Sequence, residues 1–146
     1  MSIEEQINQY ITSQAEPKCS DLEVLHKHIL QVLPNWRLWF LDGKDANGKV
    51  VSNPNIGYGT HFMKYADGKT KEFYQVGISA NTTGISVYIM GIEDKNHLKE
   101  SYGKTIGKAT ISGYCIKFKM LKDINIEILE SAILDSFMHK PDLEKG

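Results

Sequence analysis

The fold is predicted by one central stretch, residues 73–90, which reads FYQVGISANTTGISVYIM. Two runs within it, 73–79 and 85–90, are rich in aromatic and β-branched residues, as strands are. The polar residues between these runs are typical of the short turn that joins antiparallel strands. A third run of the same character, 58–65, lies before the turn dipeptide Asp67-Gly68. Together the three runs predict an antiparallel meander.

Two helices are predicted before this meander. The first spans about residues 3–14 and the second follows at once, because both segments carry apolar side chains at helical spacing. In the second, Ser20 and Glu23 match the S-x-x-E pattern in which each side chain bonds a backbone N–H of the first turn. Pro34 should end that helix. The expected apolar faces consist of Ile3, Ile7, Tyr10 and Ile11 in the first helix and Leu22, Leu25, Ile29 and Leu33 in the second.

Shorter elements complete the chain. A strand at 36–41 leads into a loop, 42–55, which is rich in turn residues and has a hairpin at Asn47-Gly48. A short helix closed by Gly103 comes next, and a last strand occupies 114–120. These segments add strands to the meander.

A final helix is predicted after Asn125, a residue type that caps helices. Its apolar stripe consists of Ile126, Leu129, Ile133, Leu134 and Phe137. Strands that are grouped between helices predict a two-layer α+β fold, with an antiparallel sheet of about five strands and the N-terminal and C-terminal helices packed on one face. We expect one domain over residues 1–140 and a flexible tail at 141–146.

Composition excludes several classes of function. The chain of 146 residues is 41% hydrophobic, which is enough for one core without a metal or a disulfide. Its net charge is −1, from 17 basic and 18 acidic residues, so nucleic acid is not an expected partner. No apolar run is long enough to cross a membrane. Cys19 and Cys115 lie far apart without the spacing of a zinc site, which indicates reduced thiols and a cytoplasmic location.

Three separated motifs resemble the YdhG-like family, a bacterial family of unknown function. Gly57-Tyr58-Gly59 leads to Lys64-Tyr65-Ala66-Asp67-Gly68, where the family has G-[FY]-G and then K-Y-x-x-G. Gly77-Ile78-Ser79 leads to Ser86-Val87-Tyr88-Ile89-Met90, where the family has G-F-S-P-R-K and then L-Y-x-M. Gly107-Lys108 leads to residues 115–121, which match the late C-L-Y-I-K-K-L strand of the family. The resemblance covers about residues 5–137.

The resemblance implies a sheet with helices packed on it, and one branch of the family is regarded as frataxin-like iron chaperones. Two departures from the family pattern stand out. Ala80-Asn81-Thr82 replaces Pro-Arg-Lys, and Ile111-Ser112-Gly113 replaces a basic turn. Both remove positive charge from a place where the family could hold an anion.

Five residues are candidates for binding a ligand. Lys64, Tyr65, Lys108 and Lys119 match basic or aromatic family positions on or near the sheet, and His61 lies on a predicted strand among aromatic residues. If their side chains converge, they could hold a small anionic or polar ligand. The simpler interpretation, and the favoured one, is a solvated sheet face that carries lysines. For His61 a hydrogen-bonded packing role is favoured over catalysis.

No catalytic set and no metal site are predicted. His26 and His28 are two residues apart on a helix and so face different directions, unlike the paired histidines of a zinc helix. The acids Glu4, Glu5, Asp21 and Glu23 lie at helix N-termini, which favour carboxylates through the dipole alone. We therefore predict no dedicated iron site and no cofactor.

The favoured function is that of a non-catalytic binding or accessory protein with a small-molecule or protein partner. One alternative is a small-molecule enzyme with a pocket on the sheet face, in which Tyr65, His61 and Lys119 would do acid–base work. The other alternative, implied by the resemblance, is a frataxin-like iron chaperone.

Overall fold

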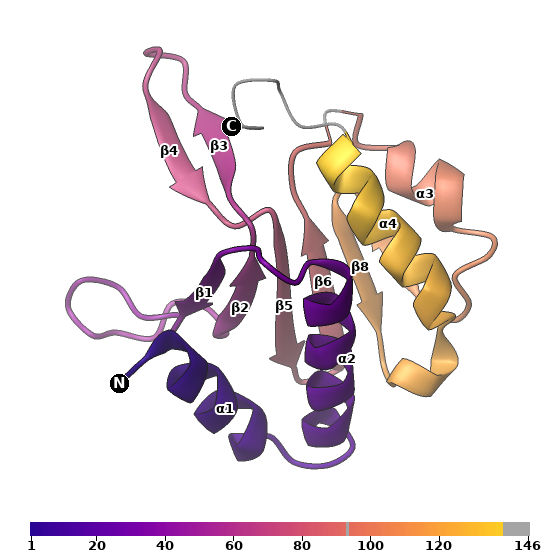
Figure 1. Cartoon of the computed structure of the whole chain (residues 1–146), viewed down its shortest axis with the longest axis horizontal. Helices are drawn as coiled ribbons and strands as arrows, with labels where there is room; N and C mark the ends of the chain where they lie inside the picture. The colour runs from indigo at the N-terminus through magenta and orange to yellow at the C-terminus, as the bar shows by residue number, and fades with distance from the viewer. Residues whose placement is uncertain (93, 139–146) are drawn as a thin grey trace.

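The chain folds as an α+β protein with an antiparallel sheet, as predicted (Figure 1). The computed structural model describes residues 1–92 and 94–138, so the expected domain boundary at 140 and the tail at 141–146 lie outside the described residues. Within that part the helices are α1 (Ile3–Ser13), α2 (Lys18–Val32), α3 (His97–Tyr102) and α4 (Ile126–Met138), with a short 3₁₀ turn at Leu121–Asp123. The strands are β1 (Leu38–Leu41), β2 (Asn55–Tyr58), β3 (His61–Lys64), β4 (Thr70–Phe73), β5 (Val76–Asn81), β6 (Gly84–Ile89), β7 (Thr110–Ser112) and β8 (Cys115–Phe118).

Six strands form the main sheet in the order β1-β2-β5-β6-β8-β7, and every neighbouring pair is antiparallel. The meander of β2, β5 and β6 lies at its centre, and the predicted turn between β5 and β6 is confirmed by the pairing of Asn81 with Gly84. Strand β7 was not predicted from the sequence. It has only three residues, of which one is buried, so its alternation is too short to recognise.

The runs 58–65 and 73–79 are not continuous strands, and this part of the prediction was wrong. The chain leaves the sheet at Gly59, whose φ of +75° is a left-handed conformation that favours glycine. It forms β3 and β4 as a separate two-stranded ribbon and then returns, where the backbone N–H of Gln75 donates to the carbonyl of Tyr58. The turn at Asp67-Gly68 therefore belongs to this ribbon, which projects from the sheet (Figure 1).

Arg37 and Trp39 hold the ribbon at its root. The guanidinium of Arg37 lies 3.9 Å from the ring centroid of Trp39 and pairs with the Glu72 carboxylate at 3.1 Å. The indole Nε1 of Trp39 donates to the carbonyl of Gly59 at 2.7 Å. These contacts join β1 to both ends of the ribbon.

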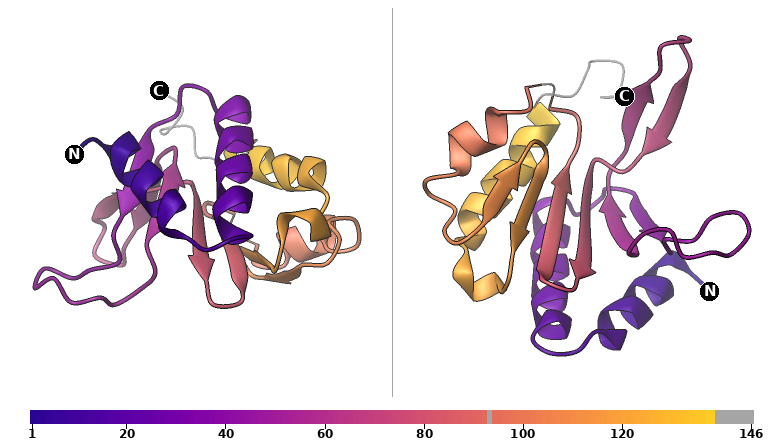
Figure 2. Two further views of the ribbon diagram at one scale, coloured as in Figure 1. Left: turned by 90° about the horizontal axis from the view of Figure 1, so that it is seen from below. Right: turned by 180° about the vertical axis from the view of Figure 1, so that it is seen from behind.

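The apolar core lies between the sheet and the helices. One row of side chains crosses four strands through the pairs Ile56–Ile78, Ile78–Val87 and Val87–Ile116, and all of these residues are buried. Helices α1, α2 and α4 lie on this side of the strands, while the view from behind shows the opposite face (Figure 2). A hydrogen bond of 2.7 Å between His28 on α2 and Glu130 on α4 joins two of these helices.

The predicted apolar faces of the helices are largely confirmed. Leu25 on α2 and Ile133 on α4 are fully buried, as expected. The exceptions are Ile3 and Leu134, which are exposed by 43% and 44% and so do not belong to the core faces.

The start of α2 differs from the prediction. The helix begins at Lys18, so Ser20 lies within its first turn and does not act as the N-cap. The capping carboxylate comes from Glu16, upstream of the helix, which accepts hydrogen bonds from the Ser20 backbone N–H at 2.9 Å and from the Ser20 hydroxyl at 2.8 Å. Glu16, which precedes the helix, therefore makes the capping contacts that were predicted for Glu23.

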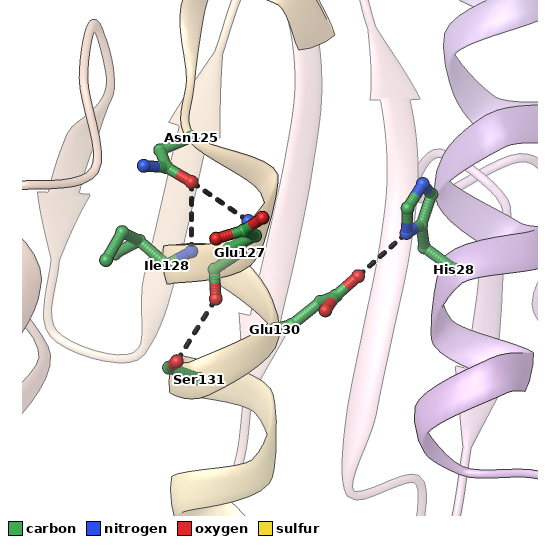
Figure 3. Close-up of polar contacts among 6 residues, drawn as sticks. All are labelled: His28, Asn125, Glu127, Ile128, Glu130 and Ser131. Atoms are coloured by element: carbon green, nitrogen blue, oxygen red, sulfur yellow. Dashed lines mark hydrogen bonds and ion pairs between the residues drawn. The ribbon is translucent and has the colours of Figure 1, made fainter.

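The predicted cap of α4 is confirmed. The side-chain oxygen of Asn125 accepts hydrogen bonds from the backbone N–H groups of Glu127 and Ile128, at 3.0 and 3.4 Å (Figure 3). The predicted hairpin at Asn47-Gly48 is also present, since the backbone N–H of Asp45 donates to Lys49 and that of Gly48 donates to Asp45.

Two glycines on the helix-free face of the sheet lie beneath one aromatic ring. Gly57 on β2 pairs with Gly77 on β5, and Tyr74 lies across both. A Cβ atom at Gly77 would stand 2.5 Å from the Tyr74 ring, so only glycine leaves room for it. The ring of Phe73 stacks on Tyr74 with 4.1 Å between the centroids. This stack covers the centre of the face that carries no helix.

Truncation of Ile133 should destabilise the protein, whereas truncation of its neighbour Leu134 should not. Ile133 is fully buried, and removal of a buried isoleucine side chain costs about 2–5 kcal/mol. Leu134 is 44% exposed, so Leu134→Ala should change the free energy of unfolding by no more than about 0.5 kcal/mol. Urea denaturation of both variants measures the difference. Equal midpoints would show that the face of α4 is wrongly placed.

Gly77→Ala should destabilise the protein by about 1–3 kcal/mol, because the added methyl group overlaps the Tyr74 ring. In a Tyr74→Ala background the same change should be neutral or stabilising, since alanine lowers the entropy cost of ordering a strand by about 0.5–1 kcal/mol relative to glycine. Denaturation of the two single variants and the double variant gives the coupling. An identical cost of Gly77→Ala in both backgrounds would contradict this packing.

Candidate functional site

The five sequence-predicted ligand residues do not converge. His61 and Lys64 lie on β3 and Tyr65 follows it, all on the ribbon. Lys119 follows β8, whose last residue Phe118 pairs with Ile85 at the start of β6. This position is the end of the sheet beside the β5–β6 turn, whereas the ribbon leaves from the opposite end of β5 (Figure 1). Lys119 is therefore separated from the other three by the length of the sheet.

Lys108 lies at the same end of the sheet as Lys119. It comes two residues before Thr110, which pairs with Lys117 on β8. Its backbone N–H donates to the carbonyl of Asp123 at 2.9 Å, which fixes the segment before β7 against the 3₁₀ turn. Lys108 does not line the cleft that adjoins Lys119.

A cleft of about 210 Å³ adjoins Lys119. It lies between the start of α2, the β5–β6 turn and the end of β8. Its lining consists of Pro17, Lys18, Thr82, Thr83, Gly84, Lys119 and Met120. This cleft is the candidate functional site, because a predicted ligand residue lines it together with groups from three separate elements.

Glycine at position 84 allows the two strand walls of the cleft to approach each other. Its φ is +150°, and a Cβ atom there would lie 2.2 Å from the carbonyl oxygen of Phe118 and 2.7 Å from the Cα of Lys119. Any side chain would push the turn away from β8. The cleft thus depends on a glycine at this position.

Two hydrogen bonds tie the first turn of α2 to the walls of the cleft. The Lys18 ammonium donates to the carbonyl of Asn81 at 2.8 Å. The Asp21 carboxylate accepts from the backbone N–H of Leu121 at 3.0 Å, just beyond Lys119 and Met120. The helix start is therefore fixed to both the β5–β6 turn and the β8 end.

Lys18 is the residue of this site that sequence reasoning missed. A cation in the first turn of a helix is disfavoured by the helix dipole, so its presence indicates a partner elsewhere in the fold. Asn81 is that partner. No sequence signal pointed to it, because the capping pattern predicted at Ser20 placed Lys18 before the first turn of the helix.

The carboxylate nearest to Lys18 in the sequence is engaged in capping. Hydrogen bonds from the backbone N–H and the hydroxyl of Ser20 lower the pKa of Glu16, so this group stays ionised at the start of α2. Neither Glu16 nor Asp21 lines the cleft. The charged side chains that do line it are both lysines.

A larger but shallower hollow of about 380 Å³ lies between α1 and the loop after β1. Its charged lining residues are Asp42 and Lys44, which are opposite in sign. Its wall includes Val51, which is 63% exposed. The charges of this hollow therefore do not favour a ligand of either sign. None of the predicted site residues lines it.

His61 takes part in a packed polar region at the base of the ribbon. A Cβ atom on Gly91 would lie 2.7 Å from Nε2 of Gln75 and 3.4 Å from Nδ1 of His61, so the two side chains flank this glycine. The Gln75 side chain is fully buried and donates to the carbonyls of Met90, at 2.7 Å, and Ser136, at 3.3 Å. The arrangement joins the end of β6 to the end of α4.

Three histidines each contact a different partner. Nδ1 of His26 lies 2.5 Å from the Tyr58 hydroxyl, and Nδ1 of His28 lies 2.7 Å from Glu130 (Figure 3). Nε2 of His97 lies 2.6 Å from the Asp135 carboxylate. The His26 contact joins α2 to β2, the His28 contact joins α2 to α4, and the His97 contact joins α3 to α4.

Asp135 also accepts a hydrogen bond of 2.7 Å from the Tyr102 hydroxyl. Burial, together with the hydrogen bond to the Asp135 carboxylate and its charge, raises the pKa of Tyr102 to about 12. The phenol is therefore neutral at physiological pH. Its role is to donate to Asp135 and to fasten α3 to α4.

The described carboxylates and thiols show no metal centre. Across residues 1–92 and 94–138, no group of three or more His, Cys, Asp or Glu side chains is arranged to hold a metal ion. Three of the acids considered for iron have other contacts, since Glu5 contacts Ser2, Asp21 accepts from Leu121 and Glu23 pairs with Lys27. In the same part of the chain, no helix is both long and apolar enough to cross a membrane.

Comparisons of the chain with protein-family models, with curated proteins and with solved structures return no match. The chemistry of the site therefore follows from the chain's own residues. Among these, the lysines, the threonine turn and the apolar side chains of the cleft form the arrangement best suited to binding.

His26 should make the protein less stable as the pH falls through about 6.5. Burial lowers the pKa of His26 in the folded chain, where Nδ1 of the ring is hydrogen-bonded to the Tyr58 hydroxyl. Burial raises the pKa of that phenol well above its usual value. Unfolding restores the ordinary pKa of the histidine, about 6.5, so the unfolded chain binds the extra proton. The stabilising contribution is present above that pH and lost below it.

The test compares the wild type with His26→Gln, which keeps an acceptor for Tyr58 but does not titrate. The free energy of unfolding is measured by urea denaturation from about pH 5 to about pH 8, which spans the ordinary histidine pKa. At the acidic end the wild type should lose more stability than His26→Gln. Parallel curves for the two proteins would contradict the assignment of a neutral, half-buried His26.

Proposed function

We propose that this chain is a non-catalytic binding protein of the YdhG-like type, and that its ligand occupies the cleft beside Lys119. The observation that carries the proposal is the convergence of α2, the β5–β6 turn and the β8 end on one hollow with two lysines and two threonines. Small-molecule sites are concave and combine apolar walls with a few placed polar groups. The ligand is a small anionic or polar molecule.

The resemblance supports this cleft as the position of the site. Residues 80–82, where this chain departs from the Pro-Arg-Lys of the family pattern, lie in and next to the β5–β6 turn, and Thr82 lines the cleft. Lys18 brings an ammonium group to Asn81 in the same segment. The Lys18 ammonium, from α2, thus supplies a positive charge beside the β5–β6 turn, whose own residues carry none.

Binding is favoured over the enzyme alternative because of where the acid–base candidates lie. That alternative requires Tyr65, His61 and Lys119 to share one pocket. Tyr65 and His61 belong to the ribbon, and Lys119 lies at the other end of the sheet. The same proposal places the protein in the cytoplasm, in keeping with Cys19 and Cys115, which are both free thiols.

A fragment screen read by amide chemical shifts tests the proposal. Fragments that bind in the cleft should shift the backbone amide signals of Lys18, Thr82 and Lys119 in the folded protein. Thr82→Trp should fill the cleft and weaken these fragments at least about tenfold, because their contact surface is lost. The matched control, Thr105→Trp, adds the same side chain at an exposed threonine outside the cleft and should leave binding unchanged.

Either of two results would count against the binding function. One is that no fragment of the screen shifts the cleft amides. The other is that the fragments bind Thr82→Trp as tightly as they bind the wild type.

A further inference from the structure

We infer that the ligand of the cleft is a small molecule with one anionic group on a compact apolar body. This inference rests on the proposed function and narrows the ligand to a chemical class. Three properties of the cleft lead to it: the sign of its charge, its apolar walls and its volume.

The charged residues that line the cleft have one sign. Lys18 and Lys119 supply two ammonium groups, and no carboxylate of residues 1–92 and 94–138 lines the cleft. The Lys18 ammonium donates to a neutral carbonyl, that of Asn81, and this contact does not neutralise its charge. Lys119 is exposed. An anion between the two would form charge-assisted hydrogen bonds, which are stronger than neutral ones.

The turn opposite the lysines is rigid and offers a neutral donor. The backbone N–H and the hydroxyl of Thr83 both donate to the side-chain oxygen of Asn81, at 3.0 and 2.8 Å. The Asn81 amide nitrogen in turn donates to the Ser86 hydroxyl at 2.8 Å. These bonds hold the turn in place, and Thr82, which is exposed and lines the cleft, has a hydroxyl that can donate to a ligand.

Pro17 and Met120 supply the apolar part of the lining. The pyrrolidine ring is rigid, and a methionine thioether adapts to the shape of a ligand. A bare inorganic anion would leave these two side chains in contact with water, whereas a ligand with an apolar body would cover them. The walls therefore favour an organic anion.

The volume limits the size of that body. An apolar cavity of about 150 Å³ is enough to bind benzene, so the cleft, with a volume of about 210 Å³, has room for one ring and a small acid group. This volume is below the usual range of about 300–1,000 Å³ for drug-sized ligands. One six-membered ring or a short aliphatic chain, with its acid group at the lysines, fits these limits.

Titration with four probes, followed by amide chemical shifts, tests the inference on the full chain. Benzoate has the anion and the ring, benzamide has the ring alone, acetate has the anion alone, and phenyl phosphate replaces the carboxylate by a phosphate. Benzoate or phenyl phosphate should shift the amides of Lys18, Thr82 and Lys119 and bind at least tenfold more tightly than benzamide and acetate. The tighter of the two shows whether the natural anion is a carboxylate or a phosphate.

Lys119→Gln should weaken the anionic ring probes about tenfold without changing the binding of benzamide, since only the charge-assisted bond is lost. Lys104→Gln is the matched control, because it removes an exposed lysine that lies outside the cleft. That control should bind benzoate as the wild type does.

The outcomes separate the inference from the proposed function. If benzamide binds in the cleft as tightly as benzoate, the anionic class is wrong while the binding function stands. If acetate binds as tightly as benzoate, the apolar body is wrong. If none of the probes shifts the cleft amides while fragments of other chemistry shift them, the ligand class is wrong. If neither the probes nor any fragment shifts these amides, the proposed binding function is wrong as well.

Discussion

The β5–β6 hairpin sets the register on which the rest of the sheet depends. Six cross-strand pairs run from Val76–Ile89 to Asn81–Gly84, and they place Ile78 and Val87 toward the helices. Because successive side chains point to opposite faces, a slip of one residue would turn these core residues outward. Gly84 closes the hairpin in a conformation and a space that no other residue can occupy without displacing β8. The same turn forms one wall of the candidate site, so the register and the site depend on one glycine.

Features that depend on neighbouring residues were readable from the sequence. The turn at 81–84, the Asn125 cap and the end of α2 before Pro34 each follow from the chemistry of a few adjacent side chains. The apolar spacing of the helices also identified Leu25 and Ile133 as core residues. Local rules were sufficient in these cases because the interacting groups are close in sequence.

Features that depend on distant contacts were not readable. The run 58–65 has the composition of one strand, but Gly59 adopts a left-handed conformation and lies against Phe137, and a Cβ atom there would approach that ring to 3.1 Å. The cleft likewise joins residues around 18, 83 and 119. Lys119 was selected from the resemblance. The place of Lys18 in the cleft is evident only from its contact with Asn81 in the structure. His61, Lys64 and Tyr65 lie elsewhere because they belong to the ribbon, and Lys108 lies before β7 and does not line the cleft.

The way the ribbon joins the sheet has a consequence for how such a chain can vary in evolution. Tyr58 and Gln75 are already hydrogen-bonded across the base of the ribbon, so β2 and β5 are neighbours whether or not the ribbon is present. The ribbon is thus a module inserted between two paired strands, and β4 has three exposed residues of four. Selection can lengthen, shorten or replace such a module without rebuilding the core. Homologues that share the sheet and the cleft could therefore differ most at this projection.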